Sequence, residues 1–148
     1  MAPLIALVAG FLVARTIGWA GVDALDGWHP ALRVGLAALF LITTSAHFIP
    51  KMRRDLEAMV PPALPHPALL VTVTGLLELA GAIGLLIPAT ATLAAACLAL
   101  LMLALFPANV SAARRKVPFG GRPATPIGIR TAEQILYVGA AVAIVVGA

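Results

Sequence analysis

The chain has 148 residues, of which 61% are hydrophobic and 11% charged, and its mean hydropathy is +1.04. A soluble domain has about 45–50% apolar and about 25% charged residues, so this composition excludes an ordinary soluble domain. It predicts an all-α membrane protein, because the apolar runs are unbroken and lack the alternation of a β-barrel. The one cysteine, Cys97, excludes dithiol exchange within the chain.

Five apolar segments, each of about 19–22 residues, predict five transmembrane helices. They span residues 3–22, 31–49, 67–87, 89–110 and 127–147. After the second segment, apolar residues recur every three or four positions. This spacing predicts a short amphipathic helix over 51–60 that lies in the membrane interface. Pro107 should kink or end the fourth helix. The whole chain, 1–148, is interpreted as a single transmembrane domain.

Basic residues gather in two loops, which follow the second and fourth segments. They are Lys51, Arg53 and Arg54 in one loop, and Arg114, Arg115, Lys116 and Arg122 in the other. The positive-inside rule therefore predicts a multi-pass protein with the N-terminus cytoplasmic and the C-terminus outside. Arg114, Arg115 and Lys116 are predicted to meet anionic lipid headgroups. Nucleic-acid binding is not expected, since no aromatic platform accompanies these charges.

Glu78 is a single carboxylate near the middle of the third segment, roughly 16 Å from its cytoplasmic edge. An ionisable group at that depth is costly and marks a functional site by default. Glu78 is either a proton acceptor in a bundle cavity or a structural carboxylate, paired with Arg15 or bound to a threonine. His47, at the end of the second segment, is either a proton relay or a helix cap. Arg15 is expected to snorkel toward the loop that holds Asp23 and Asp26.

Other polar residues have simpler interpretations. Asn109 and Gln134 can bridge helices by hydrogen bonds, and Arg130 can pair with Glu133 on the same helix. His29 and His66 are interpreted as loop residues, and the histidine spacing predicts no metal site. Small-residue faces on the last three segments would permit a homodimer.

Several motifs, taken in order, suggest a known family. They are Leu32-Arg33-Val34-Gly35, His47-Phe48-Ile49-Pro50, Val60-Pro61-Pro62, the run from Gly75 to Gly81, and Phe106-Pro107-Ala108-Asn109-Val110. Over about residues 31–134 the chain resembles the DoxX-like membrane proteins. That resemblance implies a four-helix bundle of segments two to five, with segment one added.

The resemblance also implies which residues form a site. Arg33, His47, Glu78, Asn109, Arg130 and Gln134 fall on the recurrent polar positions of DoxX-like proteins. His47 and Glu78 would then be catalytic residues that handle protons, and the other four would bind a ligand. The family takes its name from a quinone-reducing system, but this chain lacks the cysteine pairs of redox-active relatives.

Two functions from different classes follow. In the first, the chain is a bacterial inner-membrane protein whose bundle binds a lipophilic small molecule, a quinone, as the membrane subunit of a redox system. A partner subunit supplies the electrons. In the alternative, the protein is a non-enzymatic assembly factor, chaperone or partner subunit. A cavity at Glu78 would favour the first function, and a bundle that is closed there would favour the second. Whether the protein is an enzyme stays open.

Overall fold

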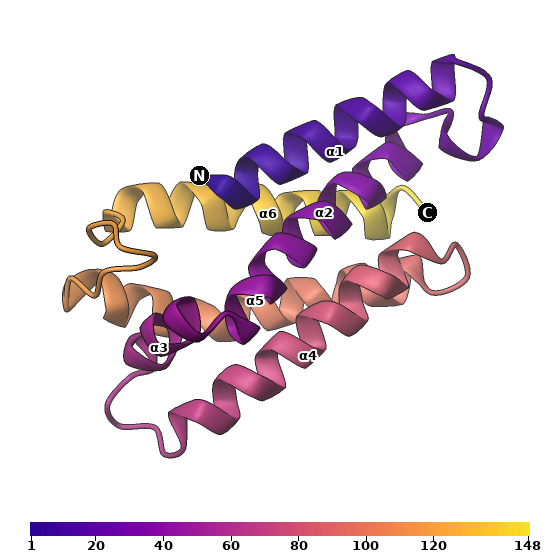
Figure 1. Cartoon of the computed structure of the whole chain (residues 1–148). Helices are drawn as coiled ribbons and strands as arrows, with labels where there is room; N and C mark the ends of the chain where they lie inside the picture. The colour runs from indigo at the N-terminus through magenta and orange to yellow at the C-terminus, as the bar shows by residue number, and fades with distance from the viewer.

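Helices account for most of the chain in the computed structural model, which describes residues 1–148 and contains no β-strand (Figure 1). The helices are α1 (Ala2–Trp19), α2 (Trp28–Phe48), α3 (Pro50–Met59), α4 (Pro67–Leu86), α5 (Ala91–Arg114) and α6 (Ile127–Val146), with a 3-10 turn, η1, at Asp23–Leu25. All of the α-helices except α3 are long and apolar enough to cross a membrane. The all-α class and the five predicted apolar helices are confirmed.

Prolines set the starts of several helices. Helices α1, α3 and α4 each have proline in one of their first two positions, where its missing N–H costs no helical hydrogen bond. His66, directly before α4, has a left-handed backbone with φ of 54°. That conformation turns the chain out of the proline-rich loop and into the helix.

The predicted end of the fourth helix, at residue 110, was wrong. Helix α5 does not end near Val110 but continues to Arg114, with Pro107 inside it. An internal proline removes one backbone hydrogen bond, and packing of the residues beyond it can offset that loss. Ala112, in this last part of α5, is fully buried, and α5 contacts α3 as well as α4 and α6. The other helix ends lie within three residues of their predicted positions.

Helix α2 is the central element of the bundle. It packs against α1, α4 and α6, while α5 packs against α4 and α6 (Figure 1). Helices α2, α4, α5 and α6 therefore form a closed ring of four, and α1 lies outside it on α2. The side chains at the centre come from all four ring helices; the largest fully buried ones are Leu36, Leu39, Leu85, Leu98 and Ile144.

Helix α3 and the loop after α5 hold one another at one end of the bundle. The guanidinium of Arg115 donates to the carbonyls of Ala58 (2.9 Å), Met59 (2.8 Å) and Val60 (3.3 Å), which close the end of α3. The N–H of Gly120 donates to Asp55 at 2.8 Å. Arg115 thus satisfies helix carbonyls that would otherwise lack a partner. The guanidinium of Arg115 is therefore engaged within the protein, and Arg114 and Lys116, which are exposed, are the residues best placed for the predicted contact with lipid headgroups.

Substituting Arg115 with alanine is expected to loosen the end of α3. Arg115 is exposed, so its bonds contribute about 1 kcal/mol or less, and amide exchange at residues 57–60 should rise up to about fivefold. Hydrogen-exchange mass spectrometry of the α3 peptide measures this. Arg114→Ala is the matched control, because Arg114 is exposed and makes no side-chain hydrogen bond. Equal protection in both variants would contradict the capping role.

Candidate polar site between α2 and α4

One face of α4 carries Glu78 into the bundle. The buried residues of α4 recur every three or four positions, which places them on one helix face. They are Val71, Gly75, Glu78, Gly81, Ala82 and Leu85. Glu78 is only 7% exposed, so its carboxyl group needs partners inside the protein.

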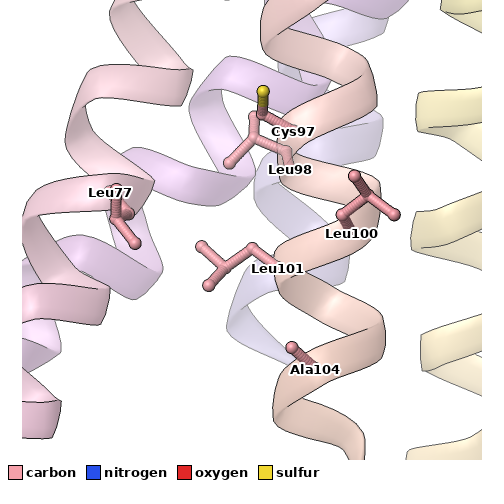
Figure 2. Close-up of a pocket in the computed structure, with 6 residues that line it drawn as sticks. All are labelled: Leu77, Cys97, Leu98, Leu100, Leu101 and Ala104. Carbon is pink, nitrogen blue, oxygen red and sulfur yellow. The ribbon is translucent and has the colours of Figure 1, made fainter.

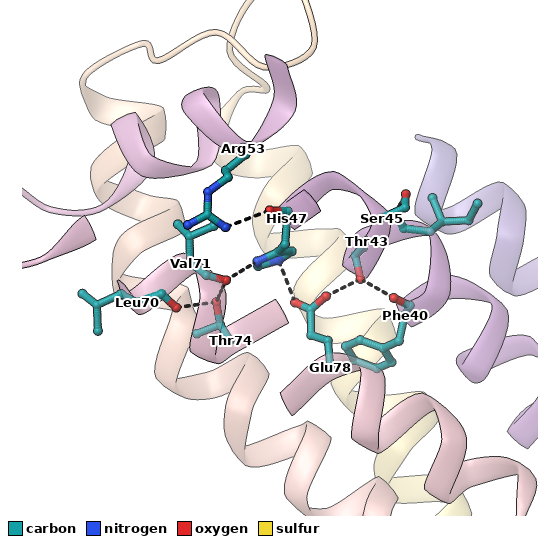
Figure 3. A network of polar contacts seen from close by, with 10 residues as sticks. Phe40, Thr43, Ser45, His47, Arg53, Leu70, Val71, Thr74 and Glu78 are labelled. Carbon is teal, nitrogen blue, oxygen red and sulfur yellow. Dashed lines mark hydrogen bonds and ion pairs between the residues drawn. The ribbon is translucent and has the colours of Figure 1, made fainter. Parts of the chain in front are cut away.

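Those partners come from α2 (Figure 3). The Oε1 of Glu78 lies 3.6 Å from Nε2 of His47, within ion-pair range. Its Oε2 accepts a 2.7 Å hydrogen bond from the hydroxyl of Thr43. Thr43 and His47 are four residues apart, so they lie one above the other on the same side of α2. Both carboxyl oxygens of Glu78 therefore face α2.

His47 is held on its other side by α4 itself. Its Nδ1 lies 2.7 Å from the carbonyl oxygen of Val71. A carbonyl only accepts hydrogen bonds, so Nδ1 carries the proton and donates it. His47 is 7% exposed, and its imidazole spans the gap between two groups of α4, namely the backbone at Val71 and the carboxyl of Glu78.

Gly75 makes room for this imidazole. A Cβ at position 75 would lie 2.7 Å from Cβ and 2.8 Å from Cγ of His47, closer than real Cβ atoms approach a neighbour. Glycine at this position lets α2 approach α4 closely, as small residues do between membrane helices.

Arg53 of α3 extends the network to the end of the bundle. It donates to the carbonyls of His47 (3.1 Å) and Ala68 (2.9 Å) and to the hydroxyl of Thr72 (2.8 Å). Its Nε lies 2.9 Å from Glu57, four residues later on α3. Helices α2, α3 and α4 are therefore joined by one set of polar contacts that runs from Glu57 to Thr43.

The other predicted site residues lie apart from Glu78. Arg33 donates to the carbonyl of Leu85 at 2.8 Å, where α4 ends. Arg130 donates to Asn109 at 3.1 Å, and Gln134 donates to the carbonyl of Met102 at 2.8 Å. No hydrogen bond or ion pair joins any of these four to His47 or Glu78. The polar partners of Glu78 thus come from α2, and α5 and α6 contribute no polar contact to it.

Of the structural partners considered for Glu78, the threonine is found and Arg15 is not, and the pairing considered between Arg130 and Glu133 is not formed. Arg15 does not reach Glu78 but pairs with Asp26 at 3.3 Å and lies 4.8 Å over the Trp19 ring, which confirms that it snorkels toward the aspartate loop. Arg130 binds Asn109 and the carbonyl of Thr125 in place of Glu133. The geometric reason is the same in both cases, because a nearer partner satisfies the guanidinium.

His29 also differs from its prediction. It was interpreted as a loop residue, but it lies in the first turn of α2, and its Nε2 is 2.9 Å from the carbonyl of Ile144 at the end of α6. His29 and Arg33, four residues apart, therefore bind the last turns of α6 and α4. A donor at a helix C-terminus meets carbonyls that lack a helical partner.

Two residues of the network were not singled out from the sequence. Thr43 could have been found from its spacing of four residues from His47, since a polar residue there shares the face of α2. Arg53 gave no comparable signal, because it resembles the other basic residues of its loop.

Two of several surface cavities can be placed between helices, and the first, with a volume of about 340 Å³, lies between α4 and α5 (Figure 2). It is lined only by apolar residues, namely Leu77, Cys97, Leu98, Leu100, Leu101 and Ala104. The second, of about 240 Å³, lies between α1 and α6. Neither cavity is lined by Glu78 or His47. No group of three or more His, Cys, Asp or Glu residues lies close enough together to hold a metal ion.

Comparison with known proteins gives a family but no function. No curated protein and no solved structure matches the chain. Residues 36–145 match the family described as "Domain of unknown function (DUF8561)". The matched region begins within α2, contains His47 and Glu78, and ends at the last turn of α6. Since it covers most of the chain, the protein belongs to the DUF8561 family.

Proposed function

We propose that the protein is a non-enzymatic membrane subunit, which acts as an assembly factor or partner subunit of a larger membrane complex. One observation carries this proposal: the six polar residues considered as site residues all bind groups of this same chain. Their side chains join α2 to α4 and α5 to α6, and none lines the α4–α5 cavity or the α1–α6 cavity. A closed polar network favours a scaffold over a substrate site.

The proposal includes a location and an orientation. The basic residues of α3 and of the loop after α5 lie at the same end of the bundle, where Arg115 joins the two. The positive-inside rule would put this end in the cytoplasm of a bacterial inner membrane. Helix α3 would then lie in the interface, with Arg114 and Lys116 near anionic headgroups. The ring of α2, α4, α5 and α6 agrees with the arrangement implied by the DoxX-like resemblance.

The α4–α5 cavity favours a second candidate, a lipophilic ligand such as a quinone in a redox system. Its volume of about 340 Å³ and its apolar lining suit an isoprenoid or acyl chain. The only hydrogen-bond donor among the six lining side chains is the weak S–H of Cys97, so this cavity suits the tail of a quinone better than its head.

The two candidates predict different contents for protein purified in mild detergent. For a scaffold, we expect solvent extracts to contain no more quinone per chain than an unrelated membrane protein purified in parallel. Cross-linking in native membranes should yield a discrete complex with a second protein, retained in Glu78→Gln.

Two tryptophan variants separate the outcomes. Ala104→Trp fills the α4–α5 cavity, and Ile135→Trp adds the same side chain at a position that is 69% exposed on α6 and outside the cavity. A stoichiometric quinone that is lost in the first variant and kept in the second would refute the scaffold proposal and support the ligand. Cross-linking that gives only single chains would also refute it.

A further inference from the structure

The contacts of His47 define its tautomer. The Val71 carbonyl at 2.7 Å requires a proton on Nδ1. In the neutral imidazole, Nε2 then has no proton and presents a lone pair. That lone pair points at Oε1 of Glu78, 3.6 Å away, as the dashed contact in Figure 3 shows.

A proton between these two atoms decides whether they attract or repel. With none, the lone pair of Nε2 would face a carboxylate oxygen, which is repulsive. With one proton, on either atom, the pair is an acid facing an imidazole or a carboxylate facing an imidazolium, and both arrangements are attractive. With a proton on each of these two atoms, two hydrogens would face each other. The contact between Nε2 and Oε1 is therefore satisfied by one proton only.

The charge of the pair leads to the same number. The pair carries a charge of minus one without this proton, zero with it, and plus one with a second. A net charge buried in a bundle at membrane depth is strongly disfavoured. The single-proton state is the neutral one.

The nearest other charge belongs to Arg53, and a carboxylate on the same helix offsets it. On α3, Arg53 donates to the backbone of His47, and Glu57 neutralises it at 2.9 Å. On α2, Thr43 is uncharged and binds the second carboxyl oxygen. Helices α1, α5 and α6 make no hydrogen bond or ion pair with either residue.

We propose that His47 and Glu78 form a proton-binding site that holds one proton between Nε2 and Oε1, so that the pair is neutral inside the membrane. The site does not depend on the scaffold function proposed above, since it follows from the contacts of the two side chains. It gives the α2–α4 interface a ligand, the proton, on which its attraction depends.

Solid-state NMR of protein in lipid nanodiscs, with ¹⁵N-labelled histidine and ¹³C-labelled glutamate, tests the site. Around neutral pH we expect one of two combined signatures: imidazolium with carboxylate, or a neutral Nδ1–H ring with carboxylic acid. A neutral ring with a carboxylate would mean no shared proton, and an imidazolium with a carboxylic acid would mean two. Either of these results would overturn the proposal.

Two isosteric variants assign the signals and test the charge argument. In Glu78→Gln the new amide donates to Nε2, so His47 should become a neutral Nδ1–H ring; an imidazolium there would contradict the proposal. In His47→Gln the carboxyl has no base to share its proton with, and we expect a carboxylic acid at Glu78. A carboxylate in that variant would contradict it as well. The second variant keeps the test decisive if the first does not fold.

Discussion

Replacing Glu78 with alanine is expected to lower the free energy of unfolding by about 3–5 kcal/mol, as removal of one partner of a buried pair does. The change leaves Nε2 of His47 and the hydroxyl of Thr43 without their α4 partner, in a region where His47 and Glu78 are each only 7% exposed. It also opens a cavity between the two helices. Thermal unfolding of purified protein, followed by the loss of monodisperse protein on size exclusion, measures this.

Glu78→Gln is the matched control for this prediction. A glutamine amide can donate to His47 while its oxygen accepts from Thr43, so we expect a loss within about 1 kcal/mol. If Glu78→Gln destabilises the bundle as much as Glu78→Ala does, the hydrogen-bonding account of the network is incorrect. If both variants are as stable as the parent protein, Glu78 does not hold α2 to α4.

Replacing Gly75 with leucine is expected to separate α2 from α4. Even a Cβ at this position would lie 2.7 Å from His47, so a larger side chain must push the imidazole away from Val71 and Glu78. Overpacking alone costs about 1–3 kcal/mol, and loss of the buried polar pair adds to that. The same thermal assay measures the effect, and the histidine ¹⁵N signals of His47 should change with it.

Gly139→Leu serves as the control for the glycine substitution. Gly139 lies in α6, and a Cβ there would meet nothing within 4 Å, so this variant should be as stable as the parent protein. Equal losses in the two variants would show that glycine at position 75 is not required by the approach of His47.

Sequence alone could predict the apolar helices, because length and hydropathy decide whether a segment can cross a membrane. It could also identify Glu78 as unusual, since one carboxyl group in an apolar helix is costly wherever its partners lie. It could not identify His47 as the partner. That contact depends on how far α2 and α4 are displaced along their axes relative to one another. His47 is the penultimate residue of α2, yet it lies beside Val71, Gly75 and Glu78, which are well inside α4.

The incorrect predictions share a physical origin. Several hydrogen-bond acceptors lie within reach of a guanidinium or amide group along the chain. Which of them is nearest depends on how the helices pack. Arg130 therefore binds Asn109 in place of Glu133, and Arg15 binds Asp26 in place of Glu78. Likewise, α5 continues past Pro107, and Ala112 beyond it is buried by tertiary contacts. The local effect of a proline on its own helix does not include such contacts.

A double-mutant cycle between His47→Ala and Glu78→Ala tests most directly whether these two residues join α2 to α4. Each single variant leaves the other buried side chain without its partner, so the double variant should lose about 1–3 kcal/mol less than the sum of the two singles. Losses that add to within about 0.5 kcal/mol, as for independent sites, would contradict the account.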